Sequence, residues 1–416
     1  MKIIELEFLR GFVAFYIFLH HVLCKYIDCN IYISKLFIFG QEAVIVFFLL
    51  SGYVISLSQF RREYNFLTYF MHRFLRIYTV VILSIILSYI VFSYINNSWS
   101  IDFKSLILNL FMLQDKPDLK PGVLVAPIFH NEPLWSLSYE WWFYMIFFVH
   151  YKVMKYFNKR TLFFILTSFI VSIIGILTYK YLYNQASLFL MYYFIWASGA
   201  SLYLVYKDKN KKIRSFFLKI ILLCYMLLIS IYFFIFIYNQ QLFYYVNHPI
   251  LEIRHYLAAF FIIILVVLYN KLGMNLKENK YIHNIFRVFS SFATISFAFY
   301  LVHYPIMLLF DSYDINGYLK VFIMFITSVF ISFVIEVIIY NKIILKMKKI
   351  YMNEQKIVSL IVSFLVIGLS ILFILCEYIS ISKNIITYII ILLFGSFFFA
   401  NYLLLVRYNK ECELKV

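Results

Sequence analysis

Residues 9–21 read LRGFVAFYIFLHH, an almost entirely apolar stretch that carries Arg10 near its start and His21 at its end. Eleven residues turn an α-helix through about three turns and rise about 16 Å, so the two side chains are predicted to share one helix face. His20 points to another face. An arginine near one membrane surface could hold an anionic ligand, and an imidazole deeper in the membrane could then accept or donate a proton further along the same path. In the alternative interpretation, Arg10 extends to lipid headgroups and His21 is a packing residue.

The whole chain has the composition of a multi-span membrane protein. Of its 416 residues, 64% are hydrophobic and 14% are charged, and the mean hydropathy is +0.87. We therefore expect an all-α polytopic integral membrane protein, a helical bundle of about 10–12 transmembrane helices. The apolar segments predict spans at residues 11–24, 40–58, 77–95, 134–151, 161–179, 186–206, 215–238, 254–270, 290–310, 318–341, 357–377 and 384–406.

The positive charges alternate along the chain. The net charge is +17, and most of the 37 Lys and Arg residues fall in every second connection. The positive-inside rule therefore predicts a multi-pass protein with both termini in the cytoplasm. Attraction to anionic lipid accounts for most of these charges, so membrane lipids and not nucleic acid are the expected partners. The five cysteines show no CxxC spacing and no pairing with histidine, so we expect no metal site.

The longest connection runs from residue 96 to residue 133 and contains four of the six prolines. A loop of this length between two spans is usually functional or disordered. Residues 106–113 within it predict a short apolar helix that lies on the membrane or dips into it, and the connection as a whole suggests an ordered lid. The two halves of the chain show no repeat, which favours one asymmetric site over a transporter built from repeats.

Two motifs follow the first span. Residues 40–53 read GQEAVIVFFLLSGY, and the Ser51-Gly52 pair at their end predicts close approach of a neighbouring helix. Further on, Arg73 and Arg76 are three residues apart and share one helix face. Such a pair suits a polyphosphate ligand, and a collar of basic residues facing lipid headgroups is the alternative.

The fourth predicted span opens with WSLSYEWW at residues 135–142. Glu140 lies about two turns inside the membrane boundary, where an ionised carboxylate is costly unless it is paired. His21 or an arginine would be a suitable partner, and a carboxylate next to an imidazole raises the basicity of that imidazole. The tryptophans of this segment are expected to be anchors at the membrane interface. They are Trp135, Trp141 and Trp142.

The ninth predicted span contains SFAFYLVHYP at residues 296–305. His303 is a candidate site residue because it is a titratable group in an apolar segment. It also stands two residues before Pro305, whose missing backbone donor frees a carbonyl in the preceding turn. The histidine could therefore equally belong to a helix kink.

Together these segments resemble the acyltransferase 3 family, the integral-membrane enzymes that O-acylate bacterial surface and secreted glycans. The resemblance rests on five segments in the family's order: Leu9-Arg10-Gly11 with His21, residues 40–53, HRFLRIY at 72–78, residues 135–140 and YLVHYP at 300–305. It covers residues 1–345, which we expect to form the membrane domain. Residues 346–416 are expected to add two transmembrane helices and a short cytoplasmic tail. Glu7, Phe8 and Thr79 depart from the family's usual residues and affect local geometry more than chemistry.

The resemblance implies a membrane O-acyltransferase of the bacterial cytoplasmic (inner) membrane. It implies acetyl-CoA as acyl donor and a hydroxyl of a surface or exported polysaccharide, free or lipid-linked, as acceptor. The expected roles are coenzyme A binding for Arg10, Arg73 and Arg76, catalysis for His21 and Glu140, and substrate binding for Trp135, Ser138 and His303. His21 would act as general base or as transient acyl carrier, and Glu140 would orient it or contact the acceptor.

Two other classes of protein share the features seen in this sequence. A secondary transporter or a flippase for a lipid-linked glycan also has about twelve spans and internal charges. A non-catalytic membrane scaffold is the third interpretation, although charges embedded in the membrane seldom persist without use. Consumption of a thioester only in the presence of a glycan distinguishes the acyltransferase from both.

Overall fold

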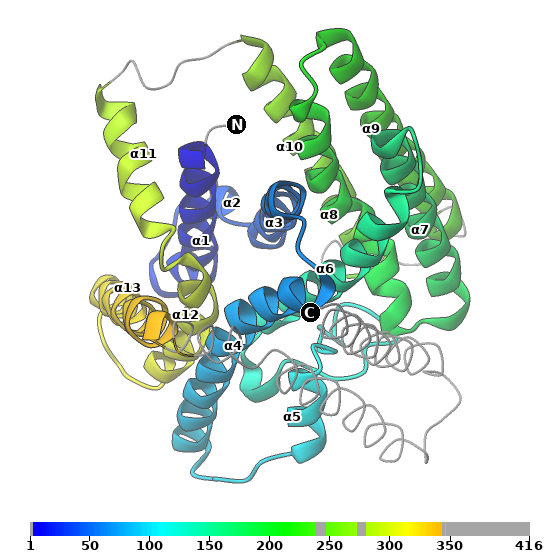
Figure 1. The fold of residues 1–416 in the computed structure, drawn as a ribbon. Helices are drawn as coiled ribbons and strands as arrows, with labels where there is room; N and C mark the ends of the chain where they lie inside the picture. The colour runs from blue at the N-terminus through cyan, green and yellow to red at the C-terminus, as the bar shows by residue number, and fades with distance from the viewer. Residues whose placement is uncertain (1–2, 238–246, 273–279, 343–345, 347–416) are drawn as a thin grey trace, which may run out of the picture.

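The computed structural model describes residues 3–237, 247–272, 280–342 and 346, which fold as a bundle of helices (Figure 1). An isolated β-bridge joins Gln114 and Val125. The helices are α1 (Ile3–Tyr26), α2 (Ile31–Leu36), α3 (Gly40–Arg62), α4 (Phe66–Asn96), α5 (Phe103–Leu110), η1 (Ile128–His130), α6 (Leu134–Met154), α7 (Arg160–Leu182), α8 (Gln185–Lys207), α9 (Lys211–Tyr232), η2 (Phe233–Ile237), α10 (Ile250–Leu272), α11 (Lys280–Phe292), α12 (Ser296–Asp311), α13 (Gly317–Phe333) and η3 (Val334–Tyr340).

The prediction of an all-α polytopic membrane protein is confirmed. In the described part of the chain, eight helices are long and apolar enough to cross a membrane, or nine if one bent pair counts as a single span. Helix α6 corresponds to the fourth predicted span but is not among the eight. It is an interior helix that lies between α4 and the α7–α8 pair (Figure 1). The predicted spans at 357–377 and 384–406 lie outside the described residues.

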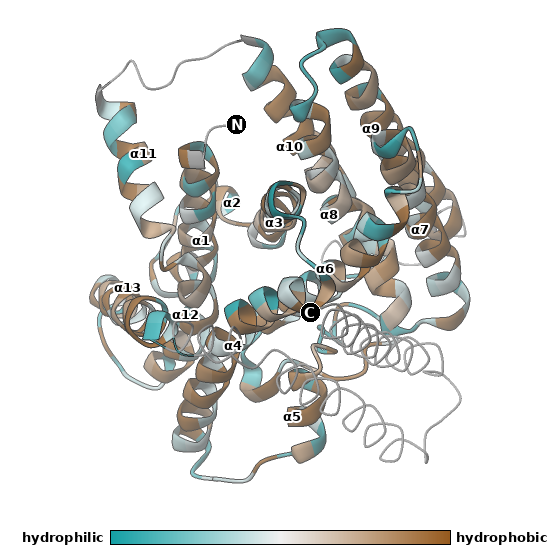
Figure 2. Ribbon diagram, viewed as in Figure 1, coloured by the Kyte–Doolittle hydropathy of each residue, from teal (hydrophilic) through white to brown (hydrophobic). Residues whose placement is uncertain are grey.

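The ninth predicted span, residues 290–310, is wrong as one continuous helix. Helix α11 ends at Phe292, α12 begins at Ser296, and their axes differ by 73°. Helix α11 carries polar residues on one side (Figure 2) and packs on α1, where the Phe8 and Phe286 rings stack with centroids 4.0 Å apart. An amphipathic helix set at an angle to a span is suited to the membrane interface. The break was not predicted because no glycine or proline stands between residues 288 and 304.

The turns between helices alternate between two ends of the bundle. The turns at residues 63–65, 155–159 and 208–210 form what we term the basic end, because Lys and Arg flank them. The long connection at 97–133 and the turns at 183–184 and 312–316 form the loop end. Asparagine side chains cap the helices that follow several of these turns and accept hydrogen bonds from free backbone N–H groups. These caps are Asn65, Asn184, Asn210 and Asn316.

Glycines bring α3 and α8 into backbone contact. A Cβ atom added to Gly52 would lie 2.1 Å from the Trp196 carbonyl oxygen, and one added to Gly199 would lie 2.1 Å from the Leu49 oxygen. The two helices therefore approach closely because each offers a glycine to the other. This contact confirms the close approach predicted at Ser51-Gly52, and it holds α3 rigidly where its side chains line the site.

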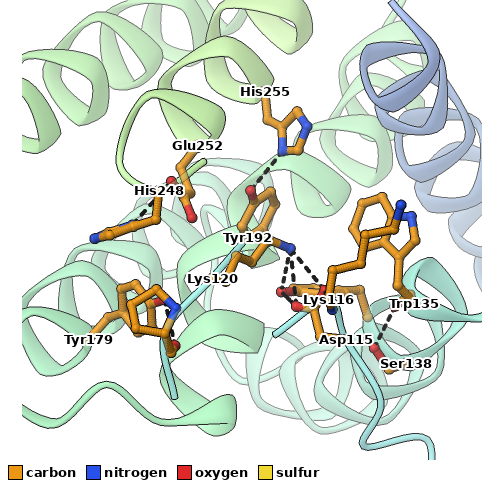
Figure 3. A network of polar contacts seen from close by, with 12 residues as sticks. Asp115, Lys116, Lys120, Trp135, Ser138, Tyr179, Tyr192, His248, Glu252 and His255 are labelled. Atoms are coloured by element: carbon orange, nitrogen blue, oxygen red, sulfur yellow. Dashed lines mark hydrogen bonds and ion pairs between the residues drawn. The ribbon is translucent and has the colours of Figure 1, made fainter. Parts of the chain in front are cut away.

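The long connection folds against the bundle at the loop end. Helix α5 (Phe103–Leu110) corresponds to the apolar helix predicted at 106–113. Beyond it, Lys120 points into the bundle, where its ammonium lies 3.1 Å from both carboxylate oxygens of Asp115 (Figure 3). Lys120 and Asp115 side chains are 2% and 0% exposed. The connection is thus anchored from within by a buried ion pair.

The three tryptophans of α6 are not interface anchors. Trp135, Trp141 and Trp142 are all at least nine-tenths buried inside the protein. The Trp142 indole donates a 2.9 Å hydrogen bond to the Met112 carbonyl, and the Trp135 ring lies 4.6 Å from the Lys120 ammonium. The prediction failed because α6 is surrounded by other helices, so its rings pack against protein where a peripheral helix would face lipid.

Candidate active site

A cavity of about 650 Å³ lies between α1, α3, α4, α6, α12 and η3. It extends from Arg62 and Tyr64 at the basic end to Ser136 in the first turn of α6. Polar side chains are spread along the whole length of this otherwise apolar space. They include Glu7, Arg10, Ser51, Ser58, His72, Arg73, Arg76, Glu140, Tyr144, Tyr300 and Tyr340. The structure therefore brings together four of the predicted site residues, Arg10, Arg73, Arg76 and Glu140.

Arg10 and Arg73 are placed to meet an anionic ligand. Arg10 comes from α1, about two turns from its start, and lines the cavity. Arg73 lies over the rings of Tyr69 and Tyr144, at 5.4 and 5.9 Å from their centroids. One of its terminal nitrogens is 3.5 Å from the Ser58 hydroxyl, and its buried Nε has no hydrogen-bond partner among the described residues. A guanidinium held by rings with unused donors suits a phosphate group.

Arg76 already has a carboxylate partner. Both of its terminal nitrogens donate to Glu336, and its guanidinium lies between the rings of Phe297 and Tyr340. Glu336 also accepts a 3.1 Å hydrogen bond from the backbone N–H of Ala298, at the start of α12. The charge of Arg76 is therefore largely balanced within the protein, which differs from the free phosphate-binding pair expected from the sequence.

Glu336 was not among the predicted site residues. It lies in the π-helical segment η3, a kind of helix distortion that is frequent at functional sites. Its partner Arg76 is 260 residues earlier, so sequence alone could not pair them. A signal was nevertheless present, because Glu336 is an acidic residue within an apolar span. The rule that selected Glu140 would have selected it.

Glu140 has hydroxyl partners and lies in the middle of the cavity wall. The Ser51 hydroxyl donates a 2.7 Å hydrogen bond to its carboxylate, and the Tyr144 hydroxyl donates another. Ser51 in turn accepts a hydrogen bond from the Trp196 indole at 3.2 Å. The structure thus gives Glu140 partners on α3 and on its own helix, where His21 or an arginine had been expected.

His21 lies beyond the inner end of the cavity and does not line it. Its ring centroid is 5.4 Å from that of His303 and 5.2 Å from that of Tyr304, both on α12. The neighbouring His20 has a different environment, because its Nδ1 pairs with the Phe37 carbonyl and its ring packs against Gly40. The separation of the two histidines into different environments agrees with the helical register.

Helix α12 connects the cavity to His21. Tyr300 lines the cavity and shares a 2.9 Å hydrogen bond with the Ser136 hydroxyl. One turn later, His303 is fully buried, and its Nδ1 pairs with the Phe299 carbonyl at 3.1 Å. Its Nε2 is buried with no hydrogen-bond partner among the described residues. A neutral His303 with a free Nε2 lone pair can accept a proton or a hydrogen bond near His21.

Trp135 and Ser138 face away from the cavity. Both are buried against the network of polar contacts around Lys120 (Figure 3). The Ser138 hydroxyl donates to the Trp135 carbonyl at 2.7 Å, a bond within the same helix. Ser136, between them, is the residue of this motif that reaches the cavity. Substrate contacts by Trp135 and Ser138 remain predictions.

A charged pair at the loop end is linked to His21 through Tyr304. The Lys116 ammonium is 2.5 Å from the Glu132 carboxylate. Burial alone would raise the pKa of Glu132, but the charge and hydrogen bond of Lys116 outweigh it and lower the pKa, with help from the Tyr304 hydroxyl. Glu132 is therefore ionised at neutral pH. These residues were not predicted because the connection at 97–133 offered no pattern that selects particular side chains.

These features define a class of protein, a polytopic membrane protein with a charged internal cavity and a histidine cluster at its inner end. The model of the acyltransferase domain family matches residues 3–341, so the chain belongs to this family. An O-acetyl transferase of Shigella phage Sf6 is 33% identical over 114 residues, which is 26% of this chain and 33% of the relative. The aligned part thus spans about a third of that relative. No solved structure matches the chain significantly.

Family membership favours the enzyme over the other two classes. The chain belongs to the acyltransferase family, and multiple helices of its described part are long and apolar enough to cross a membrane. Neither a transporter nor a scaffold is needed to explain the internal charges, because an acyl donor and an acceptor both require polar contacts within the bundle.

Proposed function

We propose that this protein transfers an acetyl group from acetyl-CoA to a hydroxyl of a surface or exported glycan. The cavity is the observation that carries the proposal. Arg10 and Arg73 line it, Glu140 lies along its wall, and Ser136 and Tyr300 close it one helical turn from the His21 cluster. Its volume of about 650 Å³ is in the range of small-molecule sites.

The donor is proposed to enter from the basic end, which faces the cytoplasm by the positive-inside rule. The phosphates of coenzyme A are matched by Arg10, Arg73 and Arg62, with Arg76 contributing in part because Glu336 shares its charge. The pantetheine arm then follows the cavity past the hydroxyls of Ser51 and Tyr144, which Glu140 holds in place. The thioester would reach Ser136 and Tyr300.

His21 is proposed to take the proton of the acceptor hydroxyl. The hydroxyl oxygen attacks the thioester carbonyl, the carbon–sulfur bond breaks, and the departing coenzyme A thiolate takes the proton from His21. In the second form of the mechanism, the imidazole itself carries the acetyl group before the hydroxyl attacks it. Both forms need His21 at the inner end of the donor path, and both give an acetyl ester and free coenzyme A.

The test is glycan-dependent consumption of acetyl-CoA. Purified protein in lipid vesicles is mixed with acetyl-CoA and with base-deacetylated polysaccharide from the source cells. We expect free thiol to appear only when the polysaccharide is present, and mass spectrometry to detect an added acetyl ester on it. Thiol release that is unchanged by the polysaccharide, or polysaccharide that crosses the membrane without being acetylated, would overturn the proposal.

A further inference from the structure

The residues around His21 differ on its two sides. Toward the basic end, the Ser136–Tyr300 hydrogen bond and the packing of Tyr300 on Phe47 close the donor cavity. Toward the loop end, the neighbours are Tyr304, whose ring is 5.2 Å from that of His21, and the Glu132–Lys116 pair. A donor that arrives from the basic end leaves the loop end as the approach for the acceptor.

The Glu132–Lys116 pair is accessible, in contrast to the other ion pair of this connection. The Glu132 side chain is 43% exposed and that of Lys116 is 18% exposed, whereas Lys120 and Asp115 are almost fully buried. Both ion pairs come from the segment 115–132, but one is buried inside the bundle and the other is accessible to solvent. The buried pair anchors the segment. The accessible pair is linked to His21 through Tyr304, whose hydroxyl bonds to Glu132 and whose ring lies 5.2 Å from the imidazole.

The chemistry of this cluster suits a sugar. A carboxylate accepts hydrogen bonds from two neighbouring hydroxyls, an ammonium donates to hydroxyl and ring oxygens, and a tyrosine offers an apolar face with a polar edge. Hydrogen bonds to charged groups are also the stronger ones. The pKa of Glu132 is lowered, so its carboxylate is available as an acceptor at neutral pH. The buried Nε2 of His303, which has no partner among the described residues, adds a further acceptor beside His21.

We propose that Glu132, Lys116 and Tyr304 form the subsite that holds the acceptor sugar against His21. This inference rests on the proposed function. Glu132 accepts hydrogen bonds from hydroxyls next to the one that is acetylated, Lys116 fixes the carboxylate and donates to the sugar, and Tyr304 places the sugar ring between this pair and the imidazole. The three residues thereby determine which hydroxyl reaches His21.

The experiment measures KM for each substrate separately. Initial rates are recorded with acetyl-CoA and the deacetylated polysaccharide for Glu132→Gln, for Tyr304→Phe, and for a double variant that exchanges the charges, Lys116→Glu with Glu132→Lys. Asp311→Asn is the matched control. Asp311 also holds a lysine and a tyrosine, at 2.5 Å from Lys25 and 2.7 Å from Tyr26, but it lies two turns beyond Tyr304 on α12.

We expect Glu132→Gln to raise KM for the polysaccharide roughly 10-fold to 100-fold, with KM for acetyl-CoA and the thermal melt unchanged. Tyr304→Phe should raise KM for the polysaccharide less, and Asp311→Asn should leave this KM unchanged. The double variant Lys116→Glu with Glu132→Lys keeps an ion pair but moves the carboxylate to position 116, so its KM for the polysaccharide should stay high. Recovery of normal polysaccharide KM by the exchange would mean that the pair is structural and overturn the inference. A normal polysaccharide KM in Glu132→Gln would do the same, whereas an inactive wild-type protein would refute the proposed function itself.

Discussion

At the scale of single residues, the two adjacent histidines of α1 give the sharpest test. We expect His21→Ala to lower the rate of transfer by roughly 10²–10⁴-fold, because a general base or acyl carrier is lost. His20→Ala should keep most of the activity, since the His20 imidazole pairs with the Phe37 carbonyl and packs on Gly40. The measurement is glycan-dependent thiol release with equal amounts of folded protein. Equal activity of the two variants would remove His21 from the site.

The arginines are distinguished by their partners. We expect Arg10→Ala and Arg73→Ala to weaken acetyl-CoA binding about 10-fold or more in a calorimetric titration, with little change in the thermal melt. Arg76→Ala should instead lower the melting temperature, because it leaves Glu336, which is 4% exposed, without its partner. Adding Glu336→Gln should restore the melt, and any remaining loss of affinity is then the contribution of Arg76 to the donor. Normal binding by Arg10→Ala and Arg73→Ala would assign both to lipid contacts.

At the scale of elements, the connection at 97–133 depends on one inward-pointing lysine. We expect Lys120→Met to destabilise the protein by about 3–5 kcal/mol, because it leaves the Asp115 carboxylate buried with the Tyr139 hydroxyl and no cation. The variant should melt earlier and be cut by protease within this connection. Lys104→Met, in the same connection but exposed, is the control and should behave as wild type. An unchanged melt for Lys120→Met would mean that the connection is held by other contacts.

The sequence predicted the positions of most helices but not how they pair. Spans follow from apolar length alone, so α1, α3, α4 and α7–α10 lie where hydropathy indicates them. The break before Ser296 was not predicted, because residues 288–304 contain no glycine or proline that would indicate the end of a helix. The burial of Lys120 could not be predicted either, because a lysine in a long connection is normally exposed to solvent.

The sequence predicted several residues of the candidate site but not which side chains they contact. Charge within an apolar span identified Arg10 and Glu140, and a shared helix face identified Arg73 and Arg76. All four line the cavity. Embedded charge gives no information on pairing, which depends on the packing of distant helices. Glu140 therefore pairs with Ser51 in place of the expected His21 or arginine, and Arg76 pairs with Glu336 although a phosphate ligand was expected.

At the scale of the whole molecule, the proposed reaction, with donor and acceptor on opposite sides, requires a fixed orientation in the membrane. We expect Lys104→Cys, at the loop end, to react with a membrane-impermeant maleimide in intact cells, in a chain otherwise free of cysteine. Lys209→Cys, in a turn of the basic end, should react only after the membrane is permeabilised. Both residues are exposed, so accessibility to the reagent depends on the side of the membrane. The opposite pattern would exchange the sides proposed for donor and acceptor.

The side chains between the donor cavity and His21 also affect whether ions can leak through the protein. A continuous water-filled passage through this bundle would let protons and ions run down the membrane potential. Tyr300, bonded to Ser136 and packed on Phe47, closes the cavity at its inner end with a hydroxyl pair and two rings. In the proposed reaction, only the acyl group at the end of a narrow flexible arm has to pass this plug to reach His21, whereas an ion would have to pass it together with its hydration shell. A protein that worked as proposed would pass a small group between two compartments and still block the flow of ions.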